Sequence, residues 1–114
     1  MKACTIKDLA KKGCVPCQGT LSALKGAALK SLLKSLGRQW KAVKGHHLEK
    51  EFKFKDFKQA LDFVVEVGGL AEAQGHHPNI YLAWGRVKIT LWTHKIDGLS
   101  ESDFALAALI EQSR

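Results

Sequence analysis

Apolar residues recur at two different spacings along this 114-residue chain. Over residues 22–36 they fall every three or four positions with lysines between them, which is the pattern of an amphipathic helix. The same spacing follows Asp56 and continues to about Gln74, which predicts a second helix. A third helix is predicted after Ser100. Because residues 104–110 are almost wholly apolar, this helix should be buried in the domain or against another subunit.

Between these helices, apolar and polar residues alternate in four short stretches. They predict β-strands at 40–43, 48–55, 80–84 and 87–93. The alternation makes one face of the sheet apolar and the other face polar and solvent-exposed. We expect the second helix to lie on the apolar face through residues at helical spacing. These residues are Phe57, Ala60, Leu61, Val64, Val65, Gly68 and Ala71.

The order helix, hairpin, helix, hairpin, helix predicts an α+β fold. We expect a two-layer sandwich in which three helices pack on one face of a four-stranded antiparallel sheet. Residues 1–20 lack this periodicity and are interpreted as a partly ordered N-terminal arm that contains the cysteines. Residues 21–114 are interpreted as one soluble domain.

The net charge of +7 is unevenly distributed. Residues 1–58 hold 14 Lys and Arg against 4 Asp and Glu, whereas residues 59–114 hold 4 against 7. Such asymmetry can mark a nucleic-acid surface, but solvated lysines on helix and strand faces explain it more simply. Arginine, which suits bidentate base and phosphate recognition, is scarce. We therefore expect no nucleic-acid partner.

The sequence contains neither a membrane span of roughly 18 apolar residues nor an apolar segment after Lys2 and Lys7 of the kind found in signal peptides. The expected location is the cytoplasm, without membrane contact. Cys4, Cys14 and Cys17 all lie in the arm, and the last two have C-x-x-C spacing. One such pair cannot complete a tetrahedral thiolate site, and no strand precedes it as in thioredoxin-like motifs, so we expect free thiols.

The stretch with the most candidate chemistry surrounds His76 and His77. Imidazole exchanges protons near neutral pH, since its reference pKa is about 6.5. The two histidines follow the second predicted helix, and His94 closes the last predicted strand on the face opposite its apolar residues. If these segments lie side by side, the three histidines converge on a small cavity. Glu72 and Asp103 stand at the two ends of the set.

Each of these residues also has a simpler structural explanation. A histidine at a strand end is commonly an ordinary surface or core residue, and His46 and His47 show that adjacent histidines alone carry little weight. Asp103 fits the third position of a capping box that begins at Ser100. Glu72 is harder to explain structurally, because a carboxylate in the last turn of a helix opposes the macrodipole.

Several of these residues form a spaced motif. Its parts are Glu72-x3-His76-His77-Pro78, the aromatic Trp84, Thr93-His94 and Asp103. Together with residues 52–57 upstream and 98–110 downstream, the motif resembles the signature of the pterin-4a-carbinolamine dehydratase family. The resemblance covers roughly residues 38–112.

This resemblance implies dehydration of 4a-hydroxytetrahydrobiopterin to quinonoid dihydrobiopterin and water. The reaction recycles the pterin cofactor of aromatic amino-acid hydroxylases. Pterin is then the substrate, and no cofactor and no metal are expected. The resemblance also implies a homodimer or homotetramer, which would give the apolar last helix a partner, and a functional link to a hydroxylase.

The resemblance assigns roles to eight residues. The implied catalytic residues are His76, His77 and His94. The residues expected to bind or orient the substrate are Glu72, Pro78, Trp84, Thr93 and Asp103. Which histidine is the acid and which is the base stays open, as does the side chain of the physiological pterin.

Two other functions are compatible with the same residues. A metalloenzyme would use the three histidines as ligands, although adjacent residues in an extended segment point to opposite faces and make awkward joint ligands. A non-catalytic binding protein would use the helical surface of the scaffold, as some animal relatives do when they act as dimerisation cofactors for a homeodomain transcription factor. The complete set of histidines with Asp103 favours catalysis.

Overall fold

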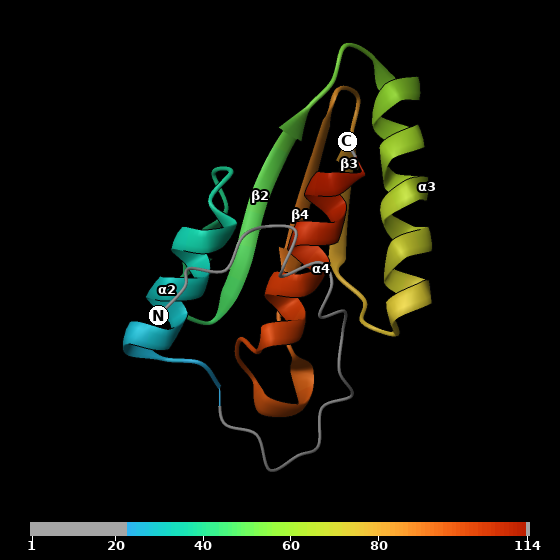
Figure 1. The fold of residues 1–114 in the computed structure, drawn as a ribbon. Helices are drawn as coiled ribbons and strands as arrows, with labels where there is room; N and C mark the ends of the chain where they lie inside the picture. The colour runs from blue at the N-terminus through green and yellow to red at the C-terminus, as the bar shows by residue number, and fades with distance from the viewer. Residues whose placement is uncertain (1–22, 114) are drawn as a thin grey trace.

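The computed structural model describes residues 23–113, so the cysteines and the proposed arm lie outside the described residues. The described chain is an α+β sandwich with a four-stranded antiparallel sheet in the order β1-β2-β4-β3, as predicted (Figure 1). Its elements are α2 (Gly26–Leu36), β1 (Lys41–Val43), β2 (His47–Lys53), α3 (Phe57–Gln74), β3 (Asn79–Ala83), β4 (Arg86–Leu91), the 3-10 helix η1 (His94–Ile96) and α4 (Glu101–Gln112).

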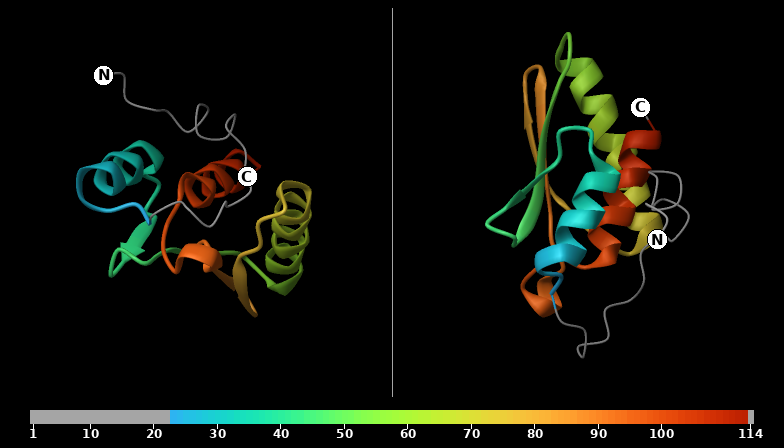
Figure 2. Two further views of the ribbon diagram at one scale, coloured as in Figure 1. Left: turned by 90° about the horizontal axis from the view of Figure 1, so that it is seen from below. Right: turned by 60° about the vertical axis from the view of Figure 1, so that its left-hand side comes forward.

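The three α-helices lie in a row on one face of the sheet (Figure 2). Helix α4 occupies the middle position and contacts both α2 and α3. Its residues 102–108 are all buried. The burial of α4 within the chain agrees with one of the two environments expected for this helix, the interior of the domain. The expectation that a second subunit also contacts this helix stays a prediction.

The apolar face of the sheet forms the floor of the core. Strands β2 and β4 pair so that Leu48 lies opposite Leu91 and Phe52 lies opposite Val87. These four side chains and Ile89 are almost completely buried. Burial of each such side chain contributes about 1.5–3 kcal/mol. None of the helices in the described part of the chain is long and apolar enough to cross a membrane.

Helix α2 begins at Gly26, four residues later than predicted. Lys25 has an extended backbone, with φ −144° and ψ 161°. The backbone N–H of Leu24 donates to the carbonyl oxygen of Leu99 at 2.8 Å. The chain before α2 is therefore bound to the segment that leads into α4, and this tertiary hydrogen bond replaces the first predicted turn of the helix.

Helix α3 begins where Asp56 predicts, since the Asp56 side chain accepts a hydrogen bond from the backbone N–H of Gln59. The prediction of its buried face was partly wrong. The residues that α3 buries are Ala60, Phe63, Val67 and Ala71. Three of the predicted core residues are exposed instead, namely Phe57 at 44%, Leu61 at 40% and Val65 at 67%. These three residues, spaced four apart, form an outer stripe on α3.

The core also contains an ion pair that the strand pattern did not predict. Lys50 of β2 lies on the buried face, and its Nζ is 2.6 Å from Oε2 of Glu111 near the end of α4. Both side chains are buried. The indole Nε1 of Trp40 donates to the same carboxylate oxygen at 3.0 Å. This pair connects the middle of the sheet to the C-terminal turn of α4.

Candidate active site

Gly75 ends α3 and sets the direction in which His76 leaves the helix. Gly75 has the left-handed backbone conformation, with φ 65° and ψ 27°. Its N–H donates to the carbonyl of Glu72, and the N–H of His76 donates to the carbonyl of Ala71, both at 3.2 Å. These two hydrogen bonds form a Schellman motif, in which glycine is the preferred residue at the left-handed position. The motif turns the chain after α3 toward the N-terminus of α4.

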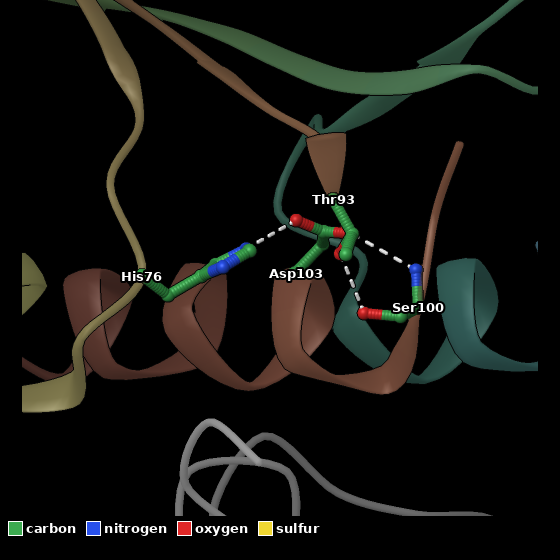
Figure 3. Close-up of polar contacts among 4 residues, drawn as sticks. All are labelled: His76, Thr93, Ser100 and Asp103. Atoms are coloured by element: carbon green, nitrogen blue, oxygen red, sulfur yellow. Dashed lines mark hydrogen bonds and ion pairs between the residues drawn. The ribbon is translucent and has the colours of Figure 1, made fainter. Parts of the chain in front are cut away.

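At that point His76 meets the carboxylate of Asp103 (Figure 3). His76 Nε2 is 2.6 Å from Oδ1 of Asp103. The other oxygen, Oδ2, accepts from the Thr93 hydroxyl at 2.8 Å and from the Ser100 backbone N–H at 2.9 Å. The hydroxyl groups of Thr93 and Ser100 are 2.7 Å apart. Asp103 therefore caps α4 and also holds His76, so both explanations of this residue apply together.

The surroundings of Asp103 suit a carboxylate that only accepts hydrogen bonds. Asp103 is fully buried, and it lies in the first turn of α4, where the positive end of the helix dipole favours a negative charge. It has Thr93 and Ser100 as donors on one oxygen. With an ionised carboxylate on the other side, His76 Nε2 must carry the hydrogen. In neutral His76 the remaining nitrogen, Nδ1, is then a hydrogen-bond acceptor and a proton acceptor.

His77 and Glu72 form a second histidine–carboxylate pair. The His77 Nε2 atom is 2.7 Å from Oε1 of Glu72, and both side chains are largely exposed. Pro78 favours an extended backbone at His77. Adjacent side chains of an extended segment alternate in direction, so His76 and His77 reach different carboxylates. The pair also gives Glu72 a favourable contact at a helix end where its charge opposes the dipole.

His94 lies on the outer face of the sheet, opposite the apolar face, as its position in the strand pattern predicted. It is the first residue of η1 and is exposed. Its ring stacks on Trp92, with 4.4 Å between ring centroids and 26° between ring planes. Within residues 23–113, neither a hydrogen bond nor a ring contact joins His94 to His76 or His77. The adjacent Thr93, which is bound to Asp103, is the connection between them.

Trp84 is placed away from these residues. It lies in the turn between β3 and β4 and is 69% exposed. At about 3.3 Å per residue, the length of β3 separates it from His77 by roughly 20 Å. The aromatic residue beside His94 is Trp92, which is not part of the spaced motif. The sequence pattern that could have identified Trp92 is the two-residue alternation of a strand, which puts Trp92 and His94 on the same face.

Ser100 was predicted only as a helix cap, and its hydroxyl and backbone N–H prove to be part of the Asp103 network. The sequence pattern that could have indicated this role of Ser100 is the Ser-x-x-Asp spacing, together with the place of Thr93 in line with the apolar residues of its strand. In the described part of the chain, no three His, Cys, Asp or Glu side chains are arranged to hold a metal ion.

A histidine held by a buried carboxylate, with a second histidine–carboxylate pair next to it in the sequence, is an arrangement suited to proton-transfer chemistry. Comparison with known proteins identifies the family that carries this fold and site. Residues 22–113 match the sequence model of the family described as pterin 4 alpha carbinolamine dehydratase. The chain therefore belongs to this family, and the match begins upstream of the resemblance found in the sequence alone.

Two bacterial relatives match nearly the whole chain, and both are named provisionally as pterin-4-alpha-carbinolamine dehydratases. The relative from Alkaliphilus metalliredigens is 50% identical over 109 residues, which cover 96% of this chain and 98% of the relative. The relative from Rubrobacter xylanophilus is 51% identical over 107 residues, which cover 94% of this chain and 99% of the relative.

Two solved structures share the fold. One is described as a transcriptional coactivator/pterin dehydratase from Brucella melitensis. It superposes with a TM-score of 0.74 at 33% identity and covers 80% of this chain and 97% of its own. The other is a pterin dehydratase-like protein identified as a RuBisCO assembly factor in the α-carboxysome, with a TM-score of 0.57 at 29% identity. It covers 68% of this chain and 90% of its own.

Proposed function

We propose that this protein removes water from 4a-hydroxytetrahydropterins by histidine acid/base catalysis. Membership of the dehydratase family supports the substrate class. The single observation that supports the mechanism is the hydrogen bond of 2.6 Å between His76 and the buried Asp103. The same proposal places the protein beside an enzyme that releases a 4a-hydroxypterin, of which an aromatic amino-acid hydroxylase is the class implied by the resemblance.

The reaction transfers protons and breaks one carbon–oxygen bond. A base removes the proton from ring nitrogen N5, the N5–C4a double bond forms, and the C4a hydroxyl leaves with an added proton as water. We assign the base to His76, because Asp103 holds hydrogen on Nε2 and leaves Nδ1 as the proton acceptor. The buried carboxylate then stabilises the imidazolium that forms. The proton for the departing hydroxyl comes from one of the other two imidazoles, His77 or His94.

The proposed reaction involves no net oxidation and so needs no redox cofactor, and in this proposal the imidazoles, not a metal ion, supply the proton transfers. We expect protein dialysed against a chelator to keep its full rate. Loss of the rate to the chelator, with recovery on addition of a stoichiometric metal, would favour a metalloenzyme instead.

The function is tested by stopped-flow absorbance on a freshly generated 4a-hydroxytetrahydropterin. We expect the wild type to form the quinonoid product much faster than buffer, and His76→Ala and His94→Ala each to lose about 10²–10⁴-fold in rate. Lys58→Ala, an exposed change on α3, serves as the control and should keep the wild-type rate. A wild type no faster than buffer would exclude the dehydratase function. Comparison of biopterin-derived and simpler carbinolamines identifies the pterin side chain.

A second candidate function is protein binding through the outer stripe of α3. The supporting observation is the exposure of Phe57, Leu61 and Val65 on one side of a regular helix. The descriptions of the two similar structures name a coactivator and an assembly factor, which are interaction roles of those proteins. We propose that this stripe is where a second copy of the chain binds in a homodimer or homotetramer. A phenotype lost in Val65→Glu and kept in His76→Ala would favour binding over catalysis.

A further inference from the structure

On the outer face of the sheet, a cluster of rings centres on Trp92, which stacks on the candidate catalytic residue His94. Besides the stacking of His94 on Trp92, the rings of His46 and His47 lie 5.6 Å and 6.1 Å from the Trp92 ring. His46 also contacts the loop that follows His94, because its Nε2 is 2.8 Å from Oδ1 of Asp97. The sequence alone gave His46 and His47 no role, and the dehydratase chemistry proposed above does not use them.

The strand register explains why these distant residues meet. Leu48 of β2 pairs with Leu91 of β4, so the next residues outward, His47 and Trp92, extend past this last pair at the same end of the two strands. Side chains alternate along a strand, and both residues therefore belong to the outer face. His46 stands one position earlier, in the turn between β1 and β2, and its Nδ1 is 3.1 Å from Nδ1 of His47.

The loop of residues 93–98 carries His94 and is fixed at three places. At its base, the Thr93 N–H donates to the Gly98 carbonyl at 2.8 Å. At its start, His94 stacks on Trp92. At its far corner, the side chain of Asp97 binds His46, and the Asp97 backbone is left-handed, with φ 47° and ψ 49°. An ionised Asp97 only accepts, so His46 Nε2 supplies the hydrogen.

We propose that His46, through its hydrogen bond to Asp97 and its contact with Trp92, positions His94 for proton transfer. This inference rests on the proposed dehydratase function. His94 is exposed, and in the described residues it makes no hydrogen bond that would orient its ring. The stack on Trp92 and the attachment of its loop to His46 therefore set the direction of the imidazole. His46 is a positioning residue in this account and does not touch the substrate.

The test uses three substitutions in the full chain. His46→Phe keeps a ring beside Trp92 but removes the donor to Asp97, and His46→Gln restores an N–H group. We expect His46→Phe to lower kcat on the order of 10²-fold with little change in KM, as a displaced catalytic group does. His46→Gln should recover part of this loss. Lys58→Met removes the donor of an exposed ion pair on α3, at 3.1 Å from Asp62, and should change nothing.

Two further measurements separate positioning from a general structural effect. In a His94→Ala background, His46→Phe should cause no additional loss of rate, because its effect passes through His94. In proton NMR, the ring resonances of His94 should lie upfield in the wild type, owing to the Trp92 ring current, and should move toward ordinary positions in His46→Phe.

Two results would overturn the inference while the wild type remains active. One is a His46→Phe protein with wild-type kcat and unchanged His94 resonances. The other is an equal loss of rate in the wild-type and His94→Ala backgrounds. A wild type without dehydratase activity would remove the proposed function and this inference together, so the wild-type rate distinguishes the two failures.

Discussion

At the scale of single residues, Asp103 is where the requirements of the fold and of the site coincide. One oxygen accepts from the Thr93 hydroxyl and from the backbone N–H of Ser100, the N-cap residue of α4, and the other faces His76. A cap of this kind is worth about 1 kcal/mol to the helix. Holding the imidazole in one tautomer matters to catalysis as well, because the tautomer decides which nitrogen can accept a proton.

We predict that Asp103→Asn largely abolishes catalysis while the protein still folds. The amide oxygen can accept from Thr93 and Ser100, but the NH2 group then donates to His76 Nε2 and moves the imidazole hydrogen to Nδ1. His76 loses its proton acceptor, so kcat should fall about 10²–10⁴-fold. The free energy of unfolding should fall by about 1–2 kcal/mol. Stopped-flow rates and urea unfolding measure the two effects.

Asp56→Asn is the matched control, since Asp56 caps α3 through the Gln59 N–H at 2.9 Å and asparagine is an equally good cap. It should keep the wild-type rate and stability within about 0.5 kcal/mol. An Asp103→Asn protein with full activity would contradict the assignment of His76 as base.

At the scale of elements, periodicity predicted the helices and strands well, because each reflects a local pattern. The face of α3 that is buried was harder to predict. Phe57, Leu61 and Val65 recur at helical spacing just as Phe63 and Val67 do, and only the position of the sheet decides which set is buried. The contact between His46 and Trp92 could not be predicted from the sequence either, since it depends on the register between β2 and β4.

The burial of Lys50 was also hard to predict from the sequence, because a lysine in an alternating strand pattern is normally assigned to the solvent-exposed face. We predict that Lys50→Met destabilises the protein by about 3–5 kcal/mol, since it removes the ammonium group that lies 2.6 Å from the buried Glu111 carboxylate. In Lys50→Met/Glu111→Gln, the amide oxygen can still accept from Trp40, and most of the stability should return.

Urea unfolding of the four proteins of this double-mutant cycle measures the coupling. Lys58→Met, at an exposed i,i+4 pair, should change stability by less than about 0.5 kcal/mol. A single Lys50→Met variant as stable as the wild type would show that the ion pair does not hold β2 to α4.

At the scale of the whole molecule, the helix order decides which surface is left for a partner. Helix α4 lies between α2 and α3, and its residues 102–108 are all buried. Among the described helices, the large apolar side chains that stay exposed are on α3. Exposed apolar patches on a small domain commonly mark interaction sites. We therefore propose that a homo-oligomer, which the family resemblance implies, forms through the outer stripe of α3.

We predict that Val65→Glu reduces the mass of the assembly in size-exclusion chromatography with light scattering. Val65 is 67% exposed in the single chain, so the substitution should leave the free energy of unfolding of one subunit nearly unchanged. In a two-fold contact each substitution occurs twice, so the contact would have to bury two carboxylates. Lys58→Glu adds negative charge to α3 outside the stripe and should leave the mass unchanged. An unchanged mass in Val65→Glu would mean that any oligomer uses another surface, and the exposed stripe would then be available to a different protein.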